Sequence, residues 1–229
     1  GNITGTAAGL SSVNFIGDGG ITLAAGKSIT MSGGIMNTGA AASVQGNILV
    51  TGVGSSTVTG QVGTAALRLT TLRAGSNTST TTFSSDVYVN STTVTGTGTI
   101  SFAGNLSGTG ASTLLFAEDG TVSVAAGKNL NLTGGGSSGI AVTNTTENQG
   151  TLILEGATSI AGGLGSTGTG LRRITLSSGT ATTSYAVDDV LTNNFSLGVN
   201  TLSITGTVGL PPSGTIALTA NSGTVYGNV

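Results

Sequence analysis

A tandem repeat of roughly 100 residues is the feature that most limits what this chain can fold into. Residues 15–34 read FIGDGGITLAAGKSITMSGG and residues 116–135 read FAEDGTVSVAAGKNLNLTGG, and the two align without a gap. Four of the six glycines of the first segment keep their places, whereas aliphatic residues exchange for one another, as Ile21 does for Val122. This is the pattern expected where Gly supplies backbone geometry and aliphatic side chains fill a common interior.

The similarity between the two copies continues downstream with small changes in the residue offset, so the two copies cover most of the chain. Residues 48–52 match residues 152–156, and Leu67-Arg68 matches Leu171-Arg172. We therefore divide the chain into three parts: a lead-in strand over residues 1–14, a first repeat over residues 15–115 and a second repeat over residues 116–229.

Short runs of β-branched and aliphatic residues between Gly-containing turns predict strands and turns. In Ile29-Thr30-Met31, every second side chain falls on one face of a strand, so the aliphatics can be buried while the hydroxyls face water. Helical spacing is not sustained, and 41 glycines are too many for stable helices. The sequence predicts an all-β fold, with strands in residues 21–23, 28–31, 47–51, 67–72, 86–90, 99–102, 121–124, 129–132, 151–154 and 201–204.

The low content of charged residues limits the classes of protein to which the chain can belong. Charged residues make up 6% of the sequence, against about 25% in a typical domain. Disorder normally accompanies low hydrophobicity and high net charge, but here the mean hydropathy is +0.33 and the net charge −2, so we expect a folded chain. No apolar stretch approaches the length of a membrane helix. Without a basic patch, nucleic acid is not an expected partner.

Two architectures fit a duplicated, Gly-rich all-β chain. The first and favoured one is a β-solenoid (β-helix) built from the two repeats, with about 20 residues per coil and about 11 coils. The alternative is two tandem β-sandwich domains of about 100 residues each. The solenoid is favoured because the strands are short and the aromatic residues, 3% of the chain, are few for two separate sandwich cores.

The chain lacks the side chains that enzymes most often use for catalysis. There is no His and no Cys, so common nucleophile–base pairs and imidazole or thiolate metal sites cannot form. Adjacent carboxylates such as Glu118-Asp119 and Asp188-Asp189 would project to opposite faces of a strand, which makes them poor acid–base dyads. We therefore predict no enzyme and no catalytic, cofactor-binding or metal-binding residues. The carboxylates considered are Asp18, Asp86, Glu118, Asp119, Glu147, Glu155, Asp188 and Asp189.

Two charged positions recur in both repeats. Asp18 and Asp119 match, and because the Gly/Asp nonapeptide of calcium-binding β-rolls does not recur around them, we predict turns in which Asp bonds its own following backbone. Lys27 and Lys128 recur within Ala-Ala-Gly-Lys, where a solvated Lys after a tight Gly turn is expected.

The remaining polar positions are interpreted as surface or structural. Arg172 and Arg173 are adjacent, so both are expected on the surface, and Arg68 and Arg73 are treated in the same way. Seven Asn-x-Ser/Thr sequences are interpreted as hydrogen-bonding ladders and turns and not as evidence of glycosylation. They begin at Asn2, Asn77, Asn90, Asn105, Asn131, Asn144 and Asn194.

Three stretches carry a resemblance to a known family: FIGDGGITLAAGKSITMSGG, NSTTVTGTGTISFAGNLSGTG and VNTLSITGTVG. In composition and periodicity they resemble passenger segments of bacterial autotransporter-type surface proteins, especially the large rickettsial surface antigens. The resemblance implies export across the outer membrane, a β-solenoid passenger, and adhesion to host cells or formation of a surface layer. Residues 215–229 lack the pattern of the family's translocator barrel, so any outer-membrane anchor would lie in a part outside this chain.

These features together predict a secreted, structural or adhesive bacterial cell-surface protein. Its expected partners are copies of itself, in a filament or layer, and host or neighbouring cell surfaces, with avidity from repeated uncharged faces. Two alternatives stay open. One is a filament subunit that donates a terminal strand to its neighbour, and the other is a polysaccharide-binding or -degrading β-helix of the tailspike or lyase kind.

Overall fold

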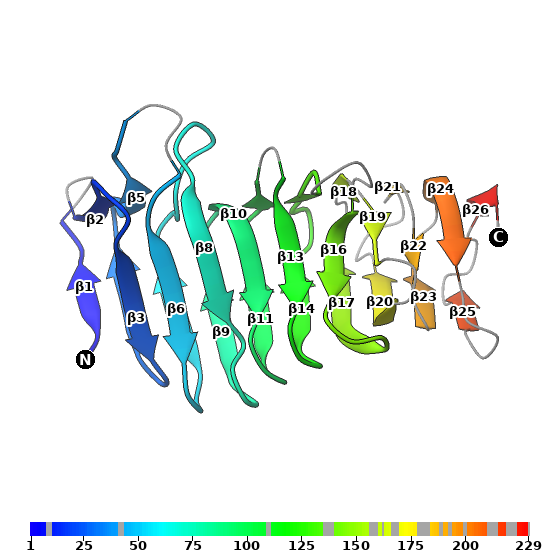
Figure 1. The fold of residues 1–229 in the computed structure, drawn as a ribbon, viewed down its shortest axis with the longest axis horizontal. Helices are drawn as coiled ribbons and strands as arrows, with labels where there is room; N and C mark the ends of the chain where they lie inside the picture. Colours follow the sequence, from blue (N-terminus) through cyan, green and yellow to red (C-terminus); the bar gives the residue numbers. More distant parts are fainter. Residues whose placement is uncertain are drawn as a thin grey trace.

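The chain forms a β-solenoid, seen in a computed structural model as coils that stack from the N-terminus to the C-terminus (Figure 1). The structure describes residues 1–7, 11–40, 44–108, 111–134, 140–155, 160–161, 163–165, 170–177, 184–187, 190–191, 194–198, 201–209, 215–218 and 224–228. Within these ranges every named strand pairs in parallel, and no helix is present. This confirms the predicted all-β solenoid and not the tandem sandwiches, whose sheets would be antiparallel.

Each coil passes through three faces, which we name A, B and C. Face A is one sheet that runs the length of the stack. Its strands are β1 (Ile3–Gly5), β4 (Ser28–Met31), β7 (Ser56–Thr59), β9 (Thr80–Phe83), β11 (Thr99–Phe102), β14 (Thr121–Val124), β17 (Gln149–Glu155), β20 (Leu171–Ser177), β23 (Asn194–Gly198) and β25 (Thr215–Leu218).

Faces B and C complete the coil, and two strands bend from one face to the other. Face C contains β3 (Gly20–Ala24), β6 (Asn47–Thr51), β8 (Leu69–Ala74), β13 (Thr113–Phe116), β16 (Ile140–Asn144), β19 (Gly163–Leu164) and β22 (Val190–Leu191). Face B contains β2 (Ser12–Phe15), β5 (Gly34–Asn37), β12 (Leu106–Ser107), β15 (Leu130–Asn131), β18 (Ile160–Ala161), β21 (Ser184–Val187) and β26 (Thr224–Asn228). The bending strands are β10 (Val87–Val94) and β24 (Thr201–Gly209), which begin on face B and end on face C.

The coils are longer and less uniform than predicted. Phe83 pairs with Phe102, 19 residues later, but Val124 pairs with Leu154, 30 residues later. The expected coil of about 20 residues therefore holds only for the shortest turns of the stack, and face A has ten strands in place of about 11 coils. The extra residues lie in the corner loops, which do not disturb the register between strands.

The interior is filled by the aliphatic and Phe side chains that alternate along each strand. Strands β9, β11 and β14 all show half-exposed and buried residues in strict alternation, as predicted. Phe83 and Phe102 stack inside face A with ring centroids 5.4 Å apart. Two inward hydroxyls interrupt this core. Thr81 and Thr92 are fully buried, and their Oγ1 atoms have no hydrogen-bond partner within the described part of the chain.

All ten predicted strand runs overlap observed strands, but two residues matched downstream in the repeats differ in local structure. Leu67 was matched to Leu171, yet Leu67 lies in a turn closed by the Thr64 amide on the Leu67 carbonyl, at 2.9 Å. Leu171 instead opens β20 and is fully buried, as Leu69 is at the start of β8.

The two repeats occupy different faces of the solenoid. Phe15 lies on face B in β2, whereas its counterpart Phe116 lies on face C in β13. In the first copy Ser28–Met31 is a strand of face A, but in the second copy the matching position is occupied by β15 of face B. The repeat thus spans four full coils and one further face, and its boundary at residues 115/116 falls inside β13.

The turns of the two copies are nevertheless the same. Gly26 has φ +68° and Gly127 φ +70°, and in both copies the Lys amide donates to the carbonyl of the first Ala of the Ala-Ala-Gly-Lys segment at 3.2 Å. Each φ lies in the left-handed region, which Gly adopts without the steric cost that a Cβ imposes. The repeated Gly is therefore required by the corner itself, whichever faces the corner joins.

The packing beside each Phe is also shared. The ring of Phe15 lies against Gly46 of the next coil, where a Cβ would stand 2.3 Å from the ring. The ring of Phe116 lies against Gly150, where a Cβ would stand 2.5 Å away. Each Phe therefore occupies the space that a side chain on the next coil would need, and a Phe and a Gly about 30 residues apart form one packing unit.

Candidate functional site

The carboxylates in the described part of the chain do not assemble into a site. Glu118, Glu147 and Glu155 are exposed, and Asp86 is half-buried in a corner. Among the described residues, no three Asp, Glu, His or Cys side chains gather in a group that could hold a metal ion. Asp188 and Asp189, the second adjacent pair considered, lie outside the described residues.

Asp18 and Asp119 are structural, but their bonds differ from those predicted. We expected each carboxylate to accept from its own following backbone. Instead, Oδ1 of Asp119 accepts from the Gly150 amide at 3.1 Å, and Oδ1 of Asp18 accepts from Nδ2 of Asn47 at 3.3 Å. Both donors lie on the next coil, because stacking places a donor of that coil directly beside the turn. These carboxylates thus join neighbouring coils.

A ladder of polar side chains follows one corner and includes Asn105, as predicted for the Asn-x-Ser/Thr sequences. Asn90 differs, because its buried Oδ1 has no hydrogen-bond partner among the described residues. The amide of Asn105 donates to Oδ1 of Asp86 at 2.8 Å, and Oδ1 of Asn105 accepts from the amide of Asn129 at 2.8 Å. Asn144 is buried and donates from Nδ2 to the carbonyls of Gln149 and Gly170. Asn77 adopts φ +49° in a turn. Asn194 lies in β23, where the structure describes no side chain.

The basic residues are mainly at the surface. Lys27, Arg73, Arg172 and Arg173 are exposed and Lys128 is half-exposed, as predicted. Arg68 differs, because it is half-buried and its Nε is enclosed without a hydrogen-bond partner in the described part of the structure.

One small polar pocket lies beside two of the arginines. Arg172 pairs with Asp119 at 2.9 Å and donates to Oγ1 of Thr151 at 3.0 Å. Thr121, Thr151, Arg172 and Arg173 line the pocket, whose volume is about 270 Å³. The carboxylate of Asp119 offsets the charge of Arg172, so the charge of the pocket comes from the exposed Arg173.

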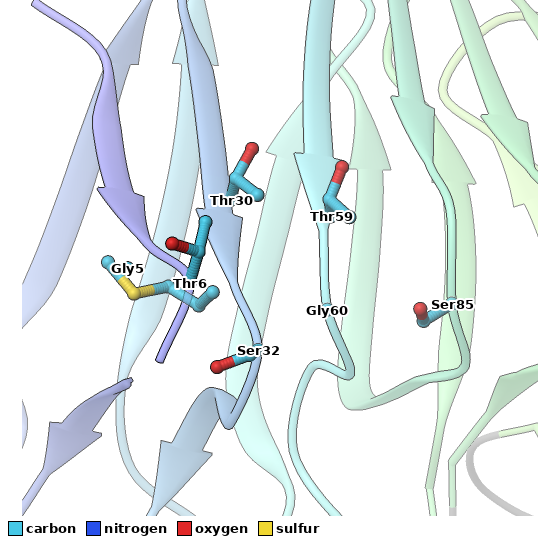
Figure 2. A pocket seen from close by; sticks show the side chains of 8 residues that line it. Gly5, Thr6, Thr30, Ser32, Thr59, Gly60 and Ser85 are labelled. Atoms are coloured by element: carbon cyan, nitrogen blue, oxygen red, sulfur yellow. The ribbon is translucent and has the colours of Figure 1, made fainter. Parts of the chain in front are cut away.

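A second cavity is a groove at the corner between faces A and B. It has a volume of about 350 Å³, and Figure 2 shows its lining. Five of its eight lining residues carry a hydroxyl and none carries a titratable side chain, so it offers hydrogen bonds to a neutral polar group but no acid or base. The lining residues are Gly5, Thr6, Thr30, Met31, Ser32, Thr59, Gly60 and Ser85.

The groove opens onto a larger feature of face A, which we name the hydroxyl field. Each of the five strands β4, β7, β9, β11 and β14 presents two outward Ser or Thr residues, separated by one fully buried residue. The strand register joins one position of each strand into a continuous column of five, because Thr57 pairs with Thr82. The second positions form two shorter columns, with those of β4 and β7 on one side of the long column and those of β9, β11 and β14 on the other. The field consists of Ser28, Thr30, Thr57, Thr59, Thr80, Thr82, Thr99, Ser101, Thr121 and Ser123.

The chain matches no protein-family model, no curated protein and no solved structure. The described residues include no helix long and apolar enough to span a bilayer. Any function must therefore be argued from the residues and their geometry.

Sequence reasoning named no site residue and did not find the hydroxyl field. Its local signal was present, because Ser-Ile-Thr, Thr-Val-Thr, Thr-Thr-Thr, Thr-Ile-Ser and Thr-Val-Ser all place a hydroxyl on each side of one inward residue. What brings these triplets together is the register between strands 19 to 29 residues apart in sequence. Irregular coil lengths hide that register from inspection of one sequence.

Proposed function

We propose that the chain is a structural or adhesive module of a secreted bacterial surface protein. The observation that carries the proposal is the unbroken parallel stack, which presents repeated, nearly uncharged outer faces and gathers no set of reactive side chains within the described residues. A surface with many weak, similar contact positions is suited to binding by avidity, through several copies of the chain at once, and not to binding of one ligand in a deep site.

The composition of the surface supports this role. The outward positions of five consecutive strands of face A are hydroxyls only. Stability comes from aliphatic stacking inside and from main-chain bonds between coils, so it needs neither disulfides nor a bound metal. A rod of this kind can be extended or interrupted at its corners without loss of register, which suits a spacer or a layer outside the cell.

The proposed partners are further copies of the chain and the surfaces of other cells, and the proposed role is not enzymatic. Asp86, Asp18 and Asp119 join neighbouring coils, and the three glutamates of the described residues are exposed and gather in no group of three acidic side chains, so a role in cutting polysaccharides has no geometric support there.

Labelling of intact cells tests this proposal. Antibodies raised against the purified chain should label intact bacteria that produce it, and brief protease treatment of those cells should remove the label. Beads coated with the chain should clump or adhere to an epithelial cell layer more than beads coated with albumin. Labelling only after permeabilisation, or coated beads that behave like the albumin beads, would contradict the proposal.

A further inference from the structure

We propose that the hydroxyl field of face A is an ice-binding surface, whose ligand is the ordered water of a crystal lattice. This inference goes beyond the adhesive role and does not depend on it. It rests on four properties of the field: its regular spacing, its free hydroxyls, its rigidity and its lack of charge.

The hydroxyls form a two-dimensional array. One continuous column runs along the solenoid, and two shorter columns flank it on opposite sides. The long column is Ser28, Thr57, Thr82, Ser101 and Ser123, and the flanking columns are Thr30 with Thr59, and Thr80 with Thr99 and Thr121. Neighbouring positions in a column are about 4.8 Å apart, the distance between strands, and the two residues of one strand are about 7 Å apart. Water oxygens in hexagonal ice also repeat in rows at two spacings close to these. The array can therefore be in register with the lattice over many positions at once.

The hydroxyls are available to such a ligand. Within the described residues, none of the ten side-chain oxygens makes a hydrogen bond to another protein group. Outward residues on face C differ, because Oγ1 of Thr71 donates to Oδ1 of Asn47 at 2.7 Å, and Leu49 and Arg73 interrupt its columns. Each free hydroxyl can both donate one hydrogen bond and accept others, as a lattice water does.

The field is rigid. Each pair of hydroxyls flanks one fully buried residue, such as Ile29, Val58 or Ile100, which fixes the backbone between them. Seven of the ten residues are Thr, whose branched Cβ restricts χ1 more than Ser does. Little side-chain entropy is lost when such an array meets an ordered surface.

Charge and size favour a lattice of water over a protein or a sugar polymer. None of the ten positions is charged, so no desolvation of an ion opposes contact with neutral ice, and none is aromatic, so a sugar ring has nothing to stack on. The field covers on the order of 300 Å² on these spacings. A stable protein interface needs about 800 Å² on each partner, so a second protein is a poor fit.

The array ends where the pattern changes. On β17 the position next to Ser123 is Ile153, and on β20 the position next to Thr151 is Arg173. The field is therefore confined to β4 to β14, and a single bulky residue near its middle should disrupt the match on both sides.

The test is the freezing behaviour of water in the presence of the purified chain. The unaltered chain should widen the gap between melting and freezing temperatures, and should facet the ice crystals, relative to albumin at equal molar concentration. Thr82→Tyr and Ser101→Tyr, at the centre of the field, should each reduce the gap several-fold. Thr93→Tyr, at an outward position of face C, should leave it unchanged.

Circular dichroism and thermal unfolding establish that each variant remains folded. If a Tyr variant unfolds, Thr82→Val takes its place, because it exchanges only the hydroxyl for a methyl group of similar size. An unaltered chain that behaves like albumin would overturn the proposal, as would equal losses in the face A and face C variants. Adsorption to microcrystalline cellulose or chitin without any effect on ice growth would also overturn it. None of these outcomes bears on whether antibodies label intact cells, so the surface role is judged separately.

Discussion

Residues 15–34 run from face B through faces C and A, whereas residues 116–135 run from face C through faces A and B. The corners nevertheless have matching φ angles and hydrogen bonds, and each Phe packs against a Gly of the next coil. Local sequence thus specifies a strand, a turn and the next strand, but not the face on which they lie. The face follows from the number of residues that precede the segment.

The comparison works because the strands of the three faces share one requirement, which is an apolar side chain at every second, inward position. The copies differ only in what surrounds them. Asp119 gains an ion pair with Arg172, while the described partner of Asp18 is Asn47. Phe116 is fully buried, whereas Phe15 is 7% exposed in a strand at the edge of face B. These differences define substitutions that test the comparison.

The largest expected effect is at the repeated Phe. Phe116→Ala should lower the free energy of unfolding by about 3–5 kcal/mol, because it leaves a cavity in a fully buried site. Phe15→Ala should cost less, because Phe15 lies in β2, the edge strand that pairs only with β5, and is 7% exposed. Denaturant unfolding of both variants measures the difference. A cost at Phe15 equal to or above that at Phe116 would show that position in the stack does not govern stability.

The repeated Gly residues come next. Gly127→Ala should cost about 1–2 kcal/mol, since its φ is left-handed but nothing lies within 4 Å of the new Cβ. Gly150→Ala should cost about 1–3 kcal/mol more, because the Cβ also overlaps the Phe116 ring.

Gly46→Ala, in the first copy, provides the matched control and should behave like Gly150→Ala in the same unfolding measurements. If the substitutions at Gly127 and Gly150 prove equally costly, the close packing of Phe on Gly is not what keeps a glycine there.

Two buried threonines test whether the faces are interchangeable. Thr81 on face A and Thr92 on face C are fully buried, and the hydroxyl of each lacks a partner in the described structure. Thr81→Val and Thr92→Val keep the shape and remove the unpaired oxygen, so each should raise stability by about 1 kcal/mol. Thermal unfolding should show similar gains. A gain on one face with a loss on the other would mean that the faces differ in their interior.

The smallest effect concerns the ion pair that only the second copy has. The Asp119 and Arg172 side chains are 35% and 44% exposed, so Asp119→Asn should cost about 0.2–1 kcal/mol, and less in high salt. Asp18→Asn should have almost no effect, because the described bond of Asp18 is to the neutral amide of Asn47. Unfolding at low and high salt distinguishes the two. Equal, salt-independent costs would assign the effect to the turn and not to the charge.

The sequence predicted the fold class and the repeated turns because both are local. Alternation around Ile29, the Gly26 corner and the exchange of Ile21 for Val122 are all visible within a few residues. It did not predict which face each strand joins, because loops such as that before Gln149 lengthen single coils. The hydroxyl field was missed for the same reason, since Thr57 and Thr82 become neighbours only through the register.

Disulfide trapping tests most directly the claim that equivalent repeat positions lie on different faces. Thr22 and Ser123 are equivalent in the repeat, yet Thr22 pairs with Leu49 on face C and Ser123 with Ser101 on face A. The chain has no cysteine of its own, and neighbouring parallel strands lie within disulfide range. The Cys pairs at 22/49 and at 101/123 should oxidise to intramolecular disulfides, whereas a pair at Thr22 and Thr57 should not. Rapid cross-linking of that last pair, or failure of the first two, would contradict the arrangement described.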